Sequence, residues 1–168
     1  AAWQVWARPE TTTLVVSETA EKAAELVRRT LRHLEKTGLR LSPDPLRRHG
    51  YLAENGSRIL PVPTRPGAIR GHRGHLSLVD EAALVSDETF AAVSGARSGL
   101  PGQPAIIIMS TPGAPKGFHF RTMTGSDPNW ERIWVSASEC PRYTEAQLEE
   151  LRRDLGEDDF NRDYNAKY

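Results

Sequence analysis

The amino-acid sequence predicts an α/β protein, a three-layer sandwich in which helices cover both faces of a mostly parallel β-sheet. Short runs that are mainly apolar or β-branched occupy residues 12–16, 76–79 and 105–109, and runs of this length are typical of strands that are buried on both faces. Helical patterns separate these runs, and strands that alternate with helices pair in parallel. The chain of 168 residues is long enough to bury one core of ordinary domain size.

The first half of the chain is expected to form the end of a helix, a strand, a full helix and a hairpin. Residues 1–7 are typical of the last turns of a helix, and a chain that opens inside a helix is expected to be a piece of a longer protein. The apolar repeat over 19–36 predicts an amphipathic helix after the strand at 12–16. Residues 48–64 predict a hairpin, because Asn55-Gly56 favours a type I′ turn.

The second half contains the other two predicted strands and a further one at Ile133–Val135. Ser86 has the side chain of an N-cap and predicts the start of a helix between strands. Near the C-terminus, Thr144 and Gln147 have the spacing of a capping box, which predicts another helix. The inner stripe of that helix would consist of three leucines at helical spacing: Leu148, Leu151 and Leu155.

Composition and charge exclude several classes of protein. The longest purely apolar stretch, Ala105–Met109, is far shorter than the roughly 18 residues of a membrane span, so no membrane is expected. The single Cys140 excludes an internal disulfide and a thiolate zinc site, and it fits a reducing compartment. Residues 1–75 carry 13 Lys and Arg against 7 Asp and Glu, whereas residues 76–168 carry 9 against 15. The net charge of zero therefore hides a basic flank that could face nucleic acid.

Two carboxylates directly follow the strand at 76–79, at the carboxyl end where ligands bind to open α/β sheets. Asp80 can hold Mg²⁺ beside the β- and γ-phosphates of a nucleotide, because Mg²⁺ prefers carboxylate oxygens and phosphates as ligands. Glu81 can polarise the attacking water as a general base. The alternative is that this pair merely closes a strand and opens a helix.

Hydroxyl side chains follow the other two strands. Ser110 and Thr111 come directly after the strand at 105–109 and could sense the γ-phosphate or couple it to a bound polymer. The alternative is a loop in which both hydroxyls bond to the local backbone. The same alternative applies to Ser17 and Thr19 after the first strand, where Thr19 is a suitable N-cap.

Among the basic residues, Arg70 is a candidate for phosphate binding, whereas the lysine of a P-loop is missing. Arg70, next to Gly71, can reach phosphate oxygens bidentately, although 18 of the 22 basic residues are arginines and an ordinary surface role is the alternative. No Gly-Lys dipeptide occurs, so the chain contains no P-loop of the form G-x-x-x-x-G-K-S/T. Either Asp80-Glu81 is not a Walker B motif, or the Walker A motif lies upstream of Ala1.

In their order and spacing, these segments resemble the large terminase subunit of tailed bacteriophages, the motor that packages DNA into proheads. The resemblance covers nearly all of the chain through six segments: Thr13–Ser17, Ala68–Gly71, Leu76–Ala82, Ile106–Pro112, Trp134–Arg142 and Phe160–Tyr164. It implies a P-loop NTPase fold of the ASCE type that lacks its P-loop in this chain. Residues 1–168 would then be a partial ATPase (motor) domain, with the P-loop expected upstream and the nuclease domain expected downstream.

The resemblance implies a role for each candidate residue. Asp80 would coordinate Mg²⁺ and Glu81 would activate the attacking water, while Ser110 and Thr111 would contact ATP and couple its hydrolysis to DNA movement. Arg70 would reach the γ-phosphate bound to a neighbouring subunit. The full protein would be an ATPase that drives double-stranded DNA into proheads, whereas the isolated chain would be inactive because it lacks the Walker A lysine. Its partners would be double-stranded DNA, the portal protein, the small terminase subunit and other copies in a homo-oligomeric ring, in the host cell cytoplasm.

Two other interpretations remain open. The first motor domain of a superfamily 2 helicase would also carry Asp-Glu and Ser-Thr motifs. It would usually have Asp-Glu-x-His or Asp-Glu-x-Asp, and here Ala82 and Ala83 follow the Asp-Glu pair. A catalytically inactive interaction module, such as a prophage remnant, could keep the sheet and lose catalysis. Nucleotide binding by the isolated chain would separate that module from an active enzyme.

Overall fold

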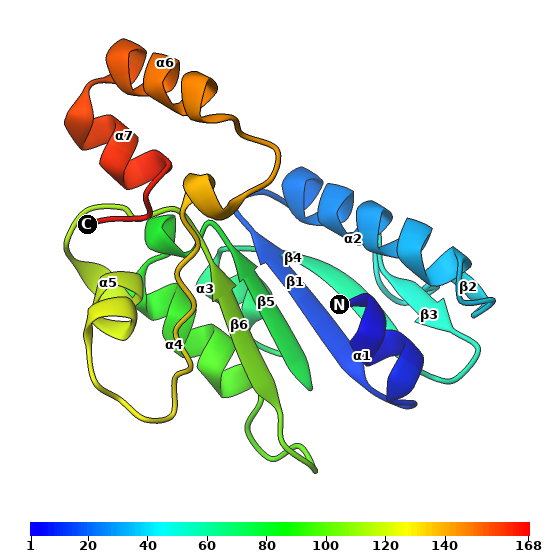
Figure 1. Cartoon of the computed structure of the whole chain (residues 1–168). Coiled ribbons are helices and arrows are strands. Elements are labelled where there is room, and N and C mark those ends of the chain that lie inside the picture. The colour runs from blue at the N-terminus through cyan, green and yellow to red at the C-terminus, as the bar shows by residue number, and fades with distance from the viewer. The chain divides into compact units, whose positions relative to one another are not determined.

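The computed structural model describes all residues, 1–168, and divides them into two compact units, Ala1–Met109 and Ser110–Tyr168. The first unit contains every strand, and the second contains helices and irregular segments. Figure 1 shows the elements of both units, coloured from the N-terminus to the C-terminus. No helix has both the length and the apolar character that a membrane crossing requires.

One sheet in the first unit contains six strands: β1 (Thr12–Ser17), β2 (Leu41–Pro43), β3 (Tyr51–Ala53), β4 (Arg58–Pro63), β5 (Leu76–Asp80) and β6 (Ala105–Met109). Their order across the sheet is β2-β3-β4-β1-β5-β6. The strands β4, β1, β5 and β6 are parallel to one another, and β2 and β3 add an antiparallel edge. The predicted mostly parallel sheet is confirmed.

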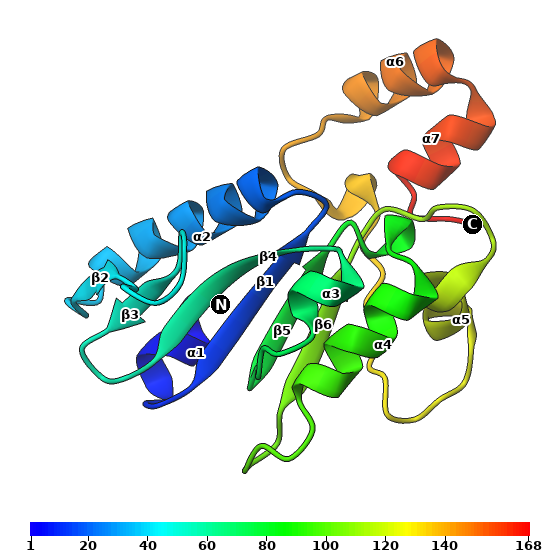
Figure 2. The ribbon, with the colours of Figure 1, turned by 180° about the vertical axis from the view of Figure 1, so that it is seen from behind.

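Helices cover both faces of this sheet (Figures 1 and 2). Helices α1 (Ala2–Ala7) and α2 (Ala20–Glu35) lie on one face. Helices α3 (Pro66–Ile69) and α4 (Asp87–Ala96) lie on the other face, and a short 3₁₀ helix, η1 (Ala82–Leu84), follows β5. The first unit therefore has the three layers that the sequence predicts.

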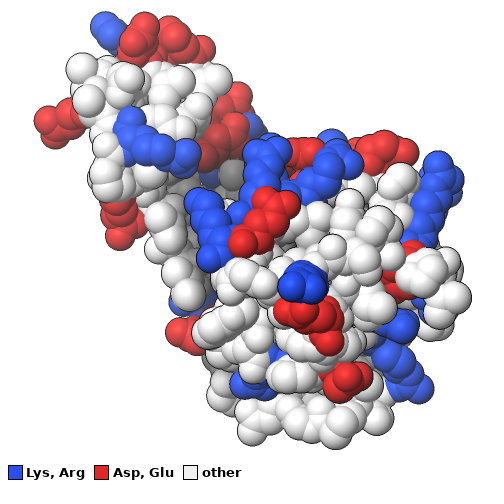
Figure 3. Space-filling model, turned by 90° about the vertical axis from the view of Figure 1, so that its right-hand side faces the viewer, with Lys and Arg blue, Asp and Glu red and all other residues white.

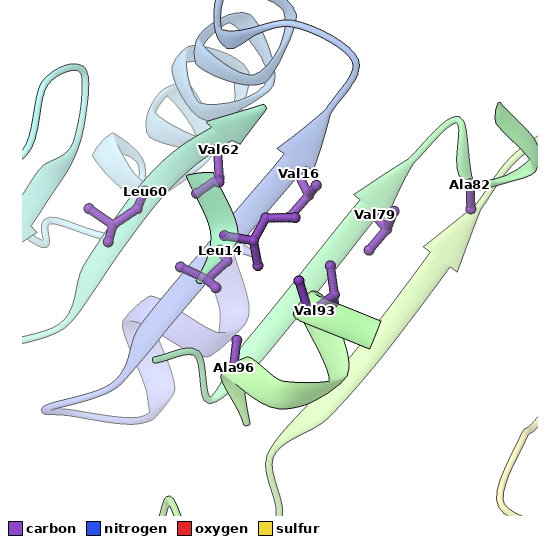
Figure 4. Packing of buried hydrophobic residues seen from close by; sticks show 10 residues of the cluster. Leu14, Val16, Leu60, Val62, Val79, Ala82, Val93 and Ala96 are labelled. Atoms are coloured by element: carbon purple, nitrogen blue, oxygen red, sulfur yellow. The ribbon is translucent and has the colours of Figure 1, made fainter. Parts of the chain in front are cut away.

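Each face of the sheet buries its own apolar core. On the face of α3 and α4, Leu14 and Val16 of β1 pack with Val79, Val93 and other buried residues (Figure 4). The core under α1 and α2 contains Val5, Val15, Val27, Leu34, Ala53 and Ile59. Because side chains alternate along a strand, β1 serves both cores, which explains its unbroken apolar sequence. Full burial of each Leu or Val side chain stabilises the fold by about 1.5–3 kcal/mol.

The hairpin between β3 and β4 is confirmed, but its turn is not the predicted type I′. A type I′ turn needs two residues with positive φ, and in the loop of residues 54–57 only Gly56 has one, at 81°. The side chain of Asn55 is held elsewhere, because Nδ2 donates to the Val5 carbonyl oxygen at 2.8 Å and Oδ1 accepts from the Ser57 N–H at 3.1 Å. These side-chain contacts, rather than the dipeptide alone, decide the turn.

Strand β6 is only half buried, although its sequence predicts a strand buried on both faces. Ile106 and Ile108 pack against the core on the side of α3 and α4, whereas Ile107 is 47% exposed and Met109 is 46% exposed. The reason is that β6 is the last strand at one edge of the sheet, and the core under α1 and α2 contains no residue of it. An unbroken apolar run therefore does not distinguish a central strand from an edge strand.

The second unit consists of α5 (Gly117–Thr124), a 3₁₀ helix η2 (Ala137–Glu139), α6 (Glu145–Leu155) and α7 (Glu157–Asp163). The predicted capping box is confirmed, since the Gln147 N–H donates to Thr144 Oγ1 and the Thr144 N–H donates to Gln147 Oε1. The predicted strand at Ile133–Val135 is wrong. These residues form an irregular, exposed segment, because β-propensity produces a strand only in a suitable sheet context.

The predicted inner stripe of α6 does not form a core, because no residue of this helix is buried. Leu148 and Leu151 are half buried, and Leu155 is exposed. The buried apolar side chain of the α6–α7 pair is instead Phe160, whose ring stacks on Tyr164 with 5.4 Å between the ring centroids. With only 7 residues, α7 covers only part of the leucine stripe.

Candidate functional site

The carboxyl ends of the parallel strands β1 and β5 bring Ser17 and Asp80 together. Val16 is paired with Val79 in the sheet, so the next residue of each strand is a neighbour of the other. The Ser17 hydroxyl donates a hydrogen bond to Asp80 Oδ2 at 3.2 Å. Because Ser17 is fully buried, its hydroxyl is fixed and holds one oxygen of the carboxylate in place.

The expectation of local backbone bonding is right for Thr19 and wrong for Ser17. Thr19 caps α2, since its Oγ1 accepts a hydrogen bond from the Lys22 N–H at 3.1 Å. Ser17 has its partner 63 residues further along the chain. The signal in the sequence is that Ser17 and Asp80 are each the first polar residue after the apolar run of a predicted parallel strand.

Glu81 has a left-handed backbone conformation, with φ 50° and ψ 45°, directly after β5. A residue with a β-carbon pays about 1–2 kcal/mol for this conformation. Consecutive residues of a strand point to opposite faces of the sheet, and the turn at Glu81 ends that alternation immediately after Asp80. Glu10, His49 and Ala166 also have a positive φ, so this conformation shapes the turn after β5 and does not by itself assign a role to Glu81.

A lysine adds positive charge beside the two carboxylates. Lys22, in the first turn of α2, forms an ion pair with Glu18. The pKa of its ammonium group is raised, chiefly by the hydrogen bond and the charge of Glu18, and further by the charges of Glu81 and Asp80. Lys22 therefore stays protonated at physiological pH. Lys22 could not be singled out from the sequence, because its place near Asp80 depends on the packing of α2 along the sheet.

The residues at the strand ends fit Mg²⁺ as the ion is usually bound with nucleotides. The chain has no group of three or more His, Cys, Asp or Glu that could hold a metal ion by itself. Mg²⁺ does not require such a group, because it is commonly bound through one or two carboxylates, several waters and the phosphates of a substrate. Asp80 offers one carboxylate, which is partly exposed and oriented by Ser17.

Arg70 lies on the face of α3 and α4 and pairs with a residue that the sequence did not suggest. It follows the last residue of α3 and precedes Gly71, which has a φ of 94°. Its Nη2 donates to Glu88 Oε1 of α4 at 3.1 Å, and both side chains are exposed. The structure therefore places Arg70 in an ion pair with Glu88 and not in one with Asp80.

Ser110 and Thr111 are the first residues of the second unit, directly after β6. Both lie in an irregular segment, and the Thr111 side chain is exposed. Their place after the strand agrees with the sequence. Their assignment to a nucleotide site stays a prediction.

The basic side chains are spread over both units, and many of them lie close to acidic side chains. The first unit has 14 Lys and Arg against 11 Asp and Glu, and the second has 8 against 11. On α2, Arg28 and Arg29 both pair with Glu25, at 2.8 Å and 3.2 Å. On the face shown in Figure 3, basic and acidic side chains are interspersed, and that face shows no continuous basic patch.

If Asp80 holds Mg²⁺ beside a bound nucleotide, replacing Ser17 by alanine should weaken Mg²⁺ binding about 2- to 12-fold, since one hydrogen bond contributes about 0.5–1.5 kcal/mol. Calorimetric titration of Mg²⁺ would measure this change. Ser77→Ala is the matched control, because Ser77 is also a fully buried strand serine but its hydroxyl has no hydrogen-bond partner. Equal effects of the two substitutions would show that Ser17 acts only through packing.

Comparison with known proteins gives matches among solved structures only, since no protein-family model and no curated protein sequence matches the chain. An arginine-to-alanine variant of the large terminase ATPase domain from Thermus phage P74-26 superimposes with a TM-score of 0.82 at 17% sequence identity. The match covers 99% of this chain and 80% of that domain.

Longer terminases match over part of their length. The large terminase of a thermophilic bacteriophage, in complex with ADP, has a TM-score of 0.77 at 13% identity, over 98% of this chain and 42% of that one. The large terminase of bacteriophage HK97 has a TM-score of 0.53 at 16% identity, over 67% of this chain and 25% of that one. The chain spans less than half of these longer proteins, and it has the fold of the ATPase domain of phage large terminases.

Proposed function

We propose that this chain is the ATPase part of a phage DNA-packaging motor, a large terminase that couples ATP hydrolysis to the translocation of double-stranded DNA into proheads. The observation that carries the proposal is the pair Asp80-Glu81 at the end of β5, with Asp80 held by Ser17 and Glu81 in a strained backbone conformation. This pair occurs in a fold shared with terminase ATPase domains. One such terminase is known in complexes with ADP and with ATP-γ-S.

In this proposal the two carboxylates have different roles, one in metal binding and one as a general base. Asp80 holds Mg²⁺, which would neutralise negative charge on the β- and γ-phosphates of ATP. Glu81 accepts a proton from the water that attacks the γ-phosphate, and a general base of this kind accelerates a reaction by about 10²–10⁴-fold. Ser17 keeps the Asp80 carboxylate in one orientation, so the metal ligand is positioned before the nucleotide arrives.

The other candidate residues act around this pair. Ser110 and Thr111 would contact ATP and couple its hydrolysis to DNA movement. Arg70 would serve the nucleotide of a neighbouring subunit in a homo-oligomeric ring. Further partners in this proposal are the portal protein and the small terminase subunit, and the place of action is the host cell cytoplasm.

Purified residues 1–168 are expected to hydrolyse ATP at the background rate, because the chain contains no Gly-Lys dipeptide and so no Walker A lysine to neutralise phosphate charge. The intact protein is expected to release phosphate from ATP only when Mg²⁺ is present. A phosphate-release assay on both proteins makes the comparison.

One result would contradict the expected inactivity of residues 1–168, and another would contradict the proposed function. Phosphate release by residues 1–168 that Glu81→Gln abolishes would show that this chain has a complete phosphate site of its own. Absence of Mg²⁺-dependent hydrolysis by the intact protein would favour an inactive interaction module instead.

A further inference from the structure

The ion pair between Arg70 and Glu88 joins two elements on the same face of the sheet. Helices α3 and α4 lie side by side there (Figure 2). Arg70 Nη2 and Glu88 Oε1 are 3.1 Å apart, and their side chains are 64% and 67% exposed. Both groups are thus in contact with water, so the pair can open without disturbing either core.

The backbone around Arg70 presents the side chain at a sharp corner. Arg70 ends α3, and Gly71 continues the chain with a φ of 94°, a conformation that other residues rarely adopt. No atom outside Gly71 and its two chain neighbours lies within 4 Å of the position that a β-carbon on Gly71 would occupy. The Arg70 side chain itself is 64% exposed, so it has room to move away from Glu88.

A second arginine of the same segment is held in a different way. Arg73 donates from Nη1 to the backbone carbonyl oxygen of Ser98, which is fixed by the chain. Arg70 is held instead by the carboxylate of Glu88, which sits on a flexible side chain. The adjoining groove, about 440 Å³ in volume, offers Arg70 no other acidic group, since the residues that line it opposite Arg70 are Ala91, Ala92, Gly95 and Ala96 of α4 and Ser98 beyond it.

We propose that Glu88 is a positioning residue that holds Arg70 against α4 until an anion of higher charge, the γ-phosphate of a nucleotide on a second copy of this chain, displaces it. This inference rests on the proposed function of Arg70. A guanidinium paired with one carboxylate presents less net positive charge to a second anion. A triphosphate carries more negative charge than a carboxylate and can accept two parallel hydrogen bonds from arginine. It therefore displaces the Glu88 carboxylate when it approaches Arg70 to hydrogen-bond distance.

The expected effect is modest, because exposed ion pairs shift an equilibrium by no more than about 5-fold. Glu88→Gln should therefore raise the kcat of the intact protein about 2- to 5-fold and make it less sensitive to salt, since salt screens the pair that the substitution removes. Glu21→Gln is the matched control. Glu21 is also an acidic residue in the first turn of a helix, α2, so its removal costs the same interaction with the helix dipole.

Two measurements test the proposal. In purified residues 1–168, nuclear magnetic resonance of the Arg70 side chain should show faster rotation of the guanidinium in Glu88→Gln than in the wild type or in Glu21→Gln. Unchanged rotation would overturn the proposal, because it would show that Glu88 does not restrain the Arg70 guanidinium. In the intact protein, a kcat for Glu88→Gln that stays equal or falls would overturn it at the functional step.

A double variant separates the failure of this inference from the failure of the proposed function. In an Arg70→Ala background, Glu88→Gln should leave the residual turnover unchanged, because the carboxylate has no arginine to hold. A gain in kcat in that background would overturn the positioning role. Normal activity of Arg70→Ala alone would overturn the role of Arg70 itself, whatever the rotation measurements show for the pair.

Discussion

Glu81→Gln in the intact protein is expected to stop ATP turnover and to leave ATP binding nearly unchanged. The substitution keeps the shape of the side chain and removes the base, so the loss, about 10²–10⁴-fold, belongs to the chemical step. Because glutamine also has a β-carbon, the strained backbone at this position stays as it is. Single-turnover phosphate release and nucleotide titration would measure the two quantities separately.

The structure supplies a matched control for Glu81. Glu10 is another glutamate with a left-handed φ, 58°, and it precedes β1 instead of following a strand. Glu10→Gln should leave turnover unchanged, whereas Asp80→Asn should weaken Mg²⁺-dependent nucleotide binding as well as turnover. If Glu81→Gln packaged DNA at the normal rate, the assignment of Asp80-Glu81 as a Walker B pair would be wrong.

Arg70→Ala in the intact protein is expected to destroy ATPase activity while the fold stays intact. An arginine that stabilises the transferring phosphoryl group is worth about 10³–10⁵ in rate. An ordinary exposed charge contributes no more than about 1 kcal/mol. Arg73→Ala is the control from the same segment, because Arg73 is engaged with the Ser98 carbonyl oxygen, and it should retain activity. Steady-state phosphate release and a thermal unfolding curve check the two halves of the prediction.

A mixing experiment asks whether Arg70 acts on a neighbouring subunit. Arg70→Ala and Glu81→Ala are each expected to be inactive alone. In a mixed ring, a Glu81→Ala subunit can donate its Arg70 to an Arg70→Ala neighbour whose Glu81 is intact, so some activity should return. No recovery in rings shown to be mixed would leave Arg70 with a role in its own subunit or in structure.

Local sequence predicts those elements whose sequence signal lies within a few neighbouring residues. The patterns that predict β1, β5, the N-cap at Ser86 and the capping box at Thr144 each lie within a few consecutive residues, and the structure confirms these elements. The Asp80-Glu81 pair could be proposed for the same reason, since it directly follows the residues that predict the strand.

Features that depend on neighbours in space could not be predicted in this way. The bond of Ser17 to Asp80 depends on which strands are adjacent, and the pair of Arg70 with Glu88 depends on how α3 packs against α4. The exposure of Ile107 follows from the edge position of its strand, which the strand's own residues do not encode. The segment at Ile133–Val135 has a strand-like sequence but pairs with no strand of the sheet, so it forms none itself.

The edge position of β6 has a practical consequence for preparing the protein. Natural edge strands usually avoid intermolecular pairing by means of charged residues, prolines or bulges, and Ala105–Met109 contains no charged residue and no proline. Its outer side offers unpaired backbone groups beside the exposed side chains of Ile107 and Met109. This is a template on which a strand of another molecule can be added. For residues 1–168 alone, aggregation at high concentration is therefore expected before thermal unfolding.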